Sequence, residues 1–92
     1  MSDRLASIPF ILECEWSRNK VDVKYDFEKL LVAKADIKLL ITQIDFRCDF
    51  EEGIKTFPKK DQNEMYLLAC WQDGSPSIFN VRQYNGMGEP IN

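Results

Sequence analysis

The sequence predicts an α/β fold, a small mixed sheet of about four strands with one principal helix and a C-terminal β-hairpin. Apolar side chains recur at every second position over residues 8–16, as in a half-buried strand. Residues 22–35 then show helical spacing, and residues 37–44 return to a strand-like apolar run. A strand, a helix and a second strand in this order predict a right-handed β-α-β unit with parallel strands. The 92 residues suit a single domain.

Residues 8–16 are expected to form the first strand, whose side chains alternate between the two faces of the sheet. The face expected to receive the helix is apolar and comprises Ile8, Phe10, Leu12, Cys14 and Trp16. The opposite face carries Ile11 and then becomes acidic at Glu13 and Glu15. Helix packing is therefore assigned to the first of these two faces.

The helix is expected to begin at Asp22, because an aspartate can cap free backbone N–H groups, and to end by Asp36. Asp26 and Lys29 are expected on the side of the helix away from the sheet. The side expected to face the sheet comprises Val23, Phe27, Leu30, Leu31 and Lys34.

The second strand, residues 37–44, is apolar enough to be a central strand covered on both faces. Residues 45–64 predict a short helix at about 49–57 followed by a loop, because Pro58 cannot continue a helix. Gly53 is expected to weaken this helix.

The C-terminal part predicts two strands, residues 65–72 and 78–84, that pair as an antiparallel hairpin. The turn between them contains Asp, Gly, Ser and Pro at residues 73–76. The leader at residues 1–7 and the tail at 85–92 are expected to lie outside the sheet, the tail as a loose segment.

A sheet with one principal helix leaves its other face poorly covered. Ile11, Tyr66 and Leu68 are expected to lie on that uncovered face. Because exposed apolar patches mark interaction sites, a homodimer or a protein partner is expected there.

Composition narrows the classes of function. A formal net charge of -3 and a pI near 4.9 argue against a broad basic surface for nucleic acids. The absence of histidine removes the commonest general base. The three cysteines include no C-x-x-C pair, which argues against a zinc site or a dithiol redox motif. With no signal peptide and no apolar run long enough to cross a bilayer, the chain is expected to be cytoplasmic, with no membrane partner.

The acidic pair Glu13 and Glu15 is the arrangement in the sequence that suggests chemistry. Residues two apart on a strand project from one face, separated by roughly 6.6 Å along the backbone. Two carboxylates placed in this way can ligate magnesium through oxygen. The alternative is that they are two solvated residues at the end of a strand.

The strings ILECEW, YDFEKLL and KLLIT, within residues 8–44, resemble the core of the PD-(D/E)xK nuclease superfamily, the restriction-endonuclease-like fold. In that family an Asp on a preceding strand joins the Glu and Lys of the D/E-x-K strand around magnesium, and the enzymes cleave DNA. Some members replace the Lys by Glu. The resemblance therefore implies Glu13 and Glu15 as catalytic residues and metal ligands, magnesium as the cofactor and DNA as a partner.

The sequence departs from the family pattern before the acidic pair. The family places a helix and a strand upstream, whereas here Asp3 is the sole upstream acid and the weak candidate for a third ligand. Lys20, Lys24 or Lys38 could replace the missing lysine in space, although an ordinary surface lysine is the favoured interpretation of each.

Three functional interpretations follow from these observations. The first is an N-terminally truncated nuclease core without full activity. The second is an active magnesium-dependent DNA nuclease that Asp3 or a second chain completes. The third is a non-enzymatic interaction module that uses the exposed sheet face.

Overall fold

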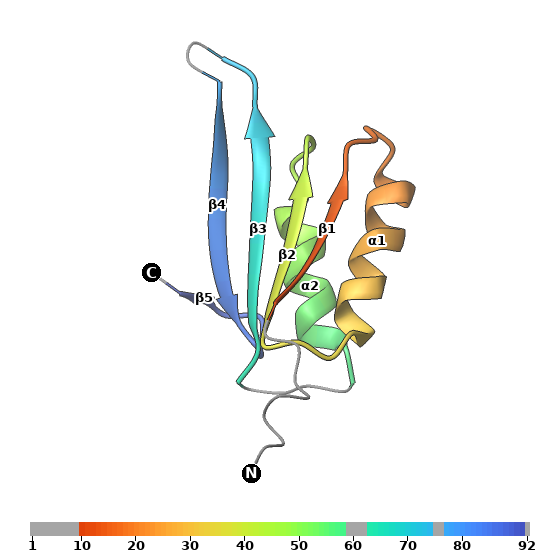
Figure 1. The fold of residues 1–92 in the computed structure, drawn as a ribbon, viewed down its shortest axis with the longest axis vertical. Helices are drawn as coiled ribbons and strands as arrows, with labels where there is room; N and C mark the ends of the chain where they lie inside the picture. Colours follow the sequence, from red (N-terminus) through yellow and green to blue (C-terminus); the bar gives the residue numbers. More distant parts are fainter. Residues whose placement is uncertain (1–9, 59–62, 75–76, 92) are drawn as a thin grey trace.

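The computed structural model describes residues 10–58, 63–74 and 77–91, and it confirms the predicted α/β class with a mixed sheet (Figure 1). Five strands lie in the order β1-β2-β3-β4-β5. The elements are β1 (Phe10–Glu15), α1 (Lys20–Val32), β2 (Ile37–Thr42), α2 (Arg47–Thr56), β3 (Met65–Gln72), β4 (Ile78–Asn85) and β5 (Pro90–Ile91). The predicted leader, with Asp3, and part of the turn at 73–76 lie outside the described residues.

The β1–α1–β2 unit is parallel, as predicted, with Phe10 opposite Ile37 and Glu15 opposite Thr42. Its helix begins earlier than Asp22, because Asn19 is the cap: the Asn19 side-chain oxygen accepts a hydrogen bond from the backbone N–H of Val21 at 2.9 Å. The helix also ends earlier, at Val32, so Lys34 lies beyond its apolar stripe.

A second parallel unit, β2–α2–β3, follows the first. The predicted short helix is present as α2, with Phe50 and Ile54 buried against the sheet. Gly53 has a packing role that its low helix propensity does not reveal. A Cβ atom at this position would lie 2.3 Å from Cε2 of Phe27 on α1, so the glycine allows the two helices to approach.

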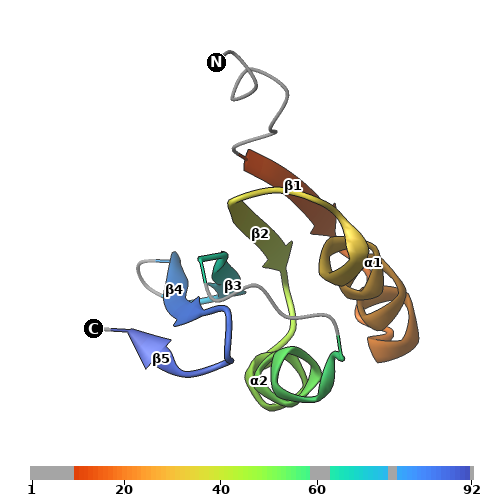
Figure 2. The same cartoon turned by 90° about the horizontal axis from the view of Figure 1, so that it is seen from below.

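Both helices cover the same face of the sheet, and Figure 2 shows the opposite face without a helix. The core lies between the helices and the sheet and comprises Val23, Phe27, Leu30, Leu31, Leu40, Phe46, Phe50, Ile54, Tyr66, Leu68, Cys70 and Tyr84. The predicted helical stripe of α1 from Val23 to Leu31 is therefore confirmed as buried.

The assignment of the two sheet faces from the sequence was wrong. Ile11 packs against the core under the helices, as do Tyr66 and Leu68, whereas Phe10 and Leu12 are 46% and 44% exposed. The physical reason is that the covered face of β1 and β2 is the more polar one. It carries Glu13, Lys38 and Thr42, whose polar atoms find partners inside the fold, so the apolar content of the strands indicated the other face. The acidic residues of β1 lie on the helix side instead of facing open solvent.

The predicted hairpin is confirmed, with β3 and β4 paired from Met65 opposite Asn85 to Gln72 opposite Ile78. The expectation of a loose tail was wrong for residues 85–91, which form a turn and the short strand β5. Asn85 organises this turn: its side-chain oxygen accepts hydrogen bonds from the backbone N–H groups of Met87 and Glu89, at 2.9 and 3.0 Å.

Candidate functional site

Glu13 and Glu15 share one face of β1, as the period of the strand predicted, and this face is covered by α1. The side chain of Glu13 is 28% exposed, so it is half-buried at the edge of the helix–sheet interface. The acidic pair is therefore not a freely solvated strand end. Its chemistry depends on what α1 places beside it.

Lys29 of α1 is the cation beside the pair. Its Nζ lies 3.7 Å from Oε1 of Glu13 and 2.9 Å from Oδ1 of Asp26, a buried carboxylate one helical turn earlier. We call Glu13, Glu15, Asp26 and Lys29 the Lys29 cluster. The sequence assigned Asp26 and Lys29 to the side away from the sheet, and this assignment was wrong because the Lys29 ammonium compensates carboxylates on both α1 and β1.

Titration of Asp26 reflects this arrangement. The hydrogen bond from Lys29 holds the pKa of the Asp26 carboxyl below its ordinary value, burial acts in the opposite direction, and the Glu15 side chain adds to the lowering. Reciprocally, the hydrogen bond to Asp26 raises the pKa of Lys29. Both groups are therefore charged at neutral pH.

Glu15 has a different partner from Glu13. Its Oε2 accepts a hydrogen bond from the backbone N–H of Ser17 at 3.0 Å. The Ser17 hydroxyl in turn accepts from the N–H of Asn19 at 3.0 Å and donates to Asp22 at 2.8 Å. Glu15 thus holds the connection between β1 and α1, while Glu13 pairs with Lys29.

The oxygen donors of the Lys29 cluster are of the kind that magnesium prefers, but the ammonium of Lys29 occupies the position between Glu13 and Asp26. Within residues 10–58, 63–74 and 77–91, no three His, Cys, Asp or Glu side chains are grouped to hold a metal ion. These residues therefore do not fit a tightly bound metal, and metal ligation by Glu13 and Glu15 stays a prediction.

The lysines considered as replacements do not approach Glu13 in the described structure. Lys20 pairs with Asp49 at 3.0 Å. Lys38 is buried, with its Nζ 3.2 Å from a carboxylate oxygen of Glu64, so the alternative of a surface lysine was wrong for this residue. Sequence reasoning missed Lys29 as the lysine nearest the pair. The available signal was its i, i+3 spacing from Asp26, which places both on one side of α1.

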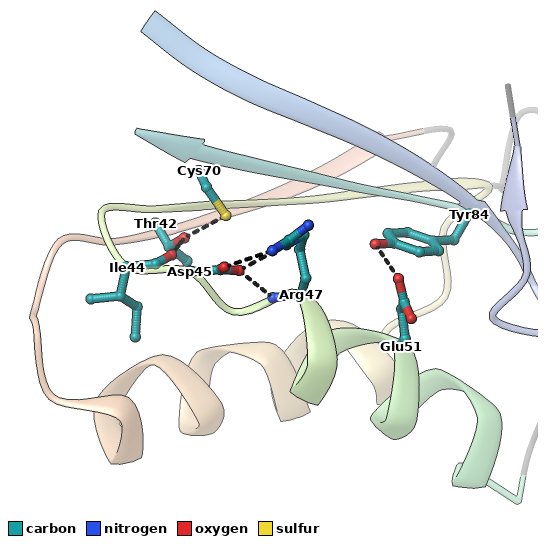
Figure 3. A network of polar contacts seen from close by, with 7 residues as sticks. All are labelled: Thr42, Ile44, Asp45, Arg47, Glu51, Cys70 and Tyr84. Carbon is teal, nitrogen blue, oxygen red and sulfur yellow. Dashed lines mark hydrogen bonds and ion pairs between the residues drawn. The ribbon is translucent and has the colours of Figure 1, made fainter. Parts of the chain in front are cut away.

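A second polar region lies where β2 and β3 end, around Asp45 and Arg47 (Figure 3). Arg47 donates to both carboxylate oxygens of Asp45, at 3.1 and 3.0 Å, and these hydrogen bonds are the main cause of the lowered pKa of Asp45. A cavity of about 320 Å³ is lined by these two residues and by Arg82 of β4. Arg82 makes no ion pair with a residue that the structure describes.

The lining of the cavity therefore combines two guanidinium groups with the Asp45 carboxylate, and the charge of Arg82 also contributes to the lowered pKa of Asp45. Sequence reasoning missed this region. Its residues come from three separate stretches of the chain, 45–47, 68–72 and 80–82, and no local spacing relates these stretches to one another. Nearby, Tyr84 donates to Glu51 at 2.8 Å, and burial is the main cause of the raised pKa of Tyr84 (Figure 3).

Comparison of the chain with protein-family models, with curated proteins and with solved structures found no match. None of the helices in the described ranges has the length and apolar character needed to cross a membrane.

Proposed function

We propose that the chain is a nuclease-like core of the PD-(D/E)xK type, and that the Lys29 cluster is its site, without full nuclease activity in the 92-residue form. The observation that carries the proposal is the position of Lys29, 3.7 Å from Glu13. The string Glu13-Cys14-Glu15 lacks the lysine of the D/E-x-K pattern, and a lysine from α1 supplies an ammonium at the same carboxylate.

The chemistry available to such a site follows from its charges. A phosphodiester that approaches the half-exposed ammonium of Lys29 would have its negative charge compensated there. Magnesium, if bound, supplies a Lewis acid that polarises the phosphate and activates water. For a metal to bind, however, Glu13 has to exchange the ammonium for the ion, and Glu15 has to turn a carboxylate that the Ser17 N–H holds at one oxygen.

Both changes weaken metal binding, and this is the reason to expect incomplete activity. Magnesium keeps its waters unless several carboxylates and a substrate phosphate converge on it. The proposal therefore predicts weak binding and no efficient cleavage. An active nuclease, completed by Asp3 or by a second chain, is the competing outcome.

The decisive experiment is a titration followed through the backbone amide signals, by their shifts with magnesium and by their line broadening with manganese. We expect weak, millimolar changes centred on residues 13–15 that are lost in Glu13→Gln. Glu28→Gln on the exposed side of α1 is the matched control and should retain them. Single- and double-stranded DNA should not be cleaved at an appreciable rate.

Two results contradict this proposal in different ways. Saturation at micromolar metal together with DNA cleavage, both lost in Glu13→Gln, would show an active nuclease. Millimolar shifts that do not centre on residues 13–15, or that persist unchanged in Glu13→Gln, would show that the cluster has only a structural role.

A further inference from the structure

The sheet face away from α1 and α2, which we call the open face, is a continuous uncharged surface. The strand registers place on it Phe10, Leu12, Cys14, Ile37, Leu39, Ile41, Met65, Leu67, Ala69, Trp71, Phe79, Val81, Gln83, Asn85 and Ile91. None of these side chains carries a charge, although the chain has 12 basic and 15 acidic residues. Within the described strands, the charged side chains therefore lie away from this face.

Large apolar side chains are exposed on the outer strands of the open face, and those of the central strands β2 and β3 are half-buried between them. Leu12 on β1 is 44% exposed, and at the far side Phe79 and Val81 on β4 are 44% and 58% exposed. Trp16, itself exposed, packs against Trp71 with 6.4 Å between the ring centroids, and Trp71 packs against Phe79 at 5.0 Å. This aromatic row extends the open face along one end of the sheet.

The size of the open face is that of a stable interface. Strands about 4.8 Å apart and about 20–25 Å long give a face of roughly 20 by 20 Å across β1 to β4. With the relief of its side chains this corresponds to on the order of 800 Å² of accessible surface, about what each partner buries in a standard interface. An apolar patch of this size exceeds what most monomers leave in water.

We propose that the open face binds the open face of a second copy of this chain. An uncharged apolar surface is complementary to itself, whereas a charged partner would gain no ion pair from it. Two identical faces related by a two-fold axis bury the same residues on both copies. The helices remain outside, so the dimer is a four-layer stack in which two sheets pack about 10 Å apart.

The oligomeric state of the full 92-residue chain tests the proposal through sedimentation velocity from about 1 to about 200 μM. We expect a reversible dimer in the wild type. Val81→Lys should raise the dimer dissociation constant by about tenfold or more, and Leu12→Lys combined with Val81→Lys should leave a monomer. Val32→Lys is the matched control, because Val32 is 68% exposed on α1, and it should dimerise like the wild type. A wild type that stays monomeric throughout, or a dimer that persists in the double variant, contradicts the proposal.

A second measurement needs only the wild-type chain and does not depend on how a variant folds. Cys14 is exposed on the open face, Cys48 is exposed on α2, and Cys70 is buried. In a dimer, labelling of Cys14 by a maleimide should slow as the protein concentration rises, while Cys48 should react at a constant rate. Equal rates at Cys14 below and above the dimer transition would overturn the proposal even if the chain self-associates.

Discussion

At the scale of single residues, the Lys29 ammonium compensates the negative charge of the carboxylates around it. Its ammonium contacts one carboxylate on its own helix and one on β1, so it links α1 to the edge strand of the sheet. A sequence pattern can place Glu13 and Glu15 on one face, because the strand period alone decides that. It cannot show that an ammonium from α1 reaches that face, because this depends on which face the helix covers.

The pH dependence of stability should report on Asp26. The pKa of Asp26 is lowered in the folded state, chiefly by Lys29, so the folded state binds this proton less readily than the unfolded chain. The stabilisation is complete above the unfolded pKa of about 3.9 and is lost as the pH falls through the lower folded pKa. The free energy of unfolding, measured in urea between pH 7 and pH 2, should therefore fall more steeply on acidification in the wild type than in Asp26→Asn. Parallel curves would mean that the ion pair with Lys29 does not stabilise the fold.

At the scale of elements, the contact between α1 and α2 depends on Gly53. Residue type alone suggested a weak point in the second helix, since glycine has a low helix propensity. The structure shows a close approach instead, with the ring of Phe27 in the space where a side chain would lie. The start of α1 also depends on a single residue, because Asn19 and not Asp22 is its N-cap. Asparagine and aspartate are both common at the N-cap, so residue type alone did not distinguish them.

Gly53→Ala is therefore expected to destabilise the protein. The higher helix propensity of alanine would favour the variant by up to about 1 kcal/mol. The new Cβ, 2.3 Å from the Phe27 ring, should cost more, and we expect a net loss of about 1–2 kcal/mol in denaturant melts. In a Phe27→Leu background the loss should shrink, because the ring is no longer there. A stabilised Gly53→Ala variant would show that the two helices can separate without cost.

At the scale of the whole molecule, the sequence predicted the order of the elements, the parallel β1–β2 pair and the β3–β4 hairpin. These depend on local period and on turn residues, which a single sequence displays. It did not predict which face is covered. The covered face of β1 and β2 carries Glu13, Lys38 and Thr42, so apolar content alone indicated the wrong face. The placement of two helices on the same side is a property of the assembled sheet.

Because the two sheet faces are exchanged relative to the prediction, the uncovered face is formed by other residues than the sequence suggested. The residues predicted for it, Ile11, Tyr66 and Leu68, pack under the helices, and the residues predicted to receive the helix form the open face. The expectation of an uncovered sheet face therefore points to different side chains than the sequence suggested. The Lys29 cluster lies on the covered side of the sheet, so the two surfaces can be tested independently.

The account depends most on the statement that Lys29 competes with a metal ion for Glu13. The measurement that tests it most directly is the magnesium affinity of Lys29→Met beside that of the wild type, obtained from amide shifts. Removing a unit charge about 4 Å from a divalent ion should strengthen binding by about fivefold or more. Lys24→Met, which removes an exposed lysine from the same helix, should leave the affinity close to that of the wild type. An affinity in Lys29→Met that is equal to the wild-type value, or weaker, would contradict the account.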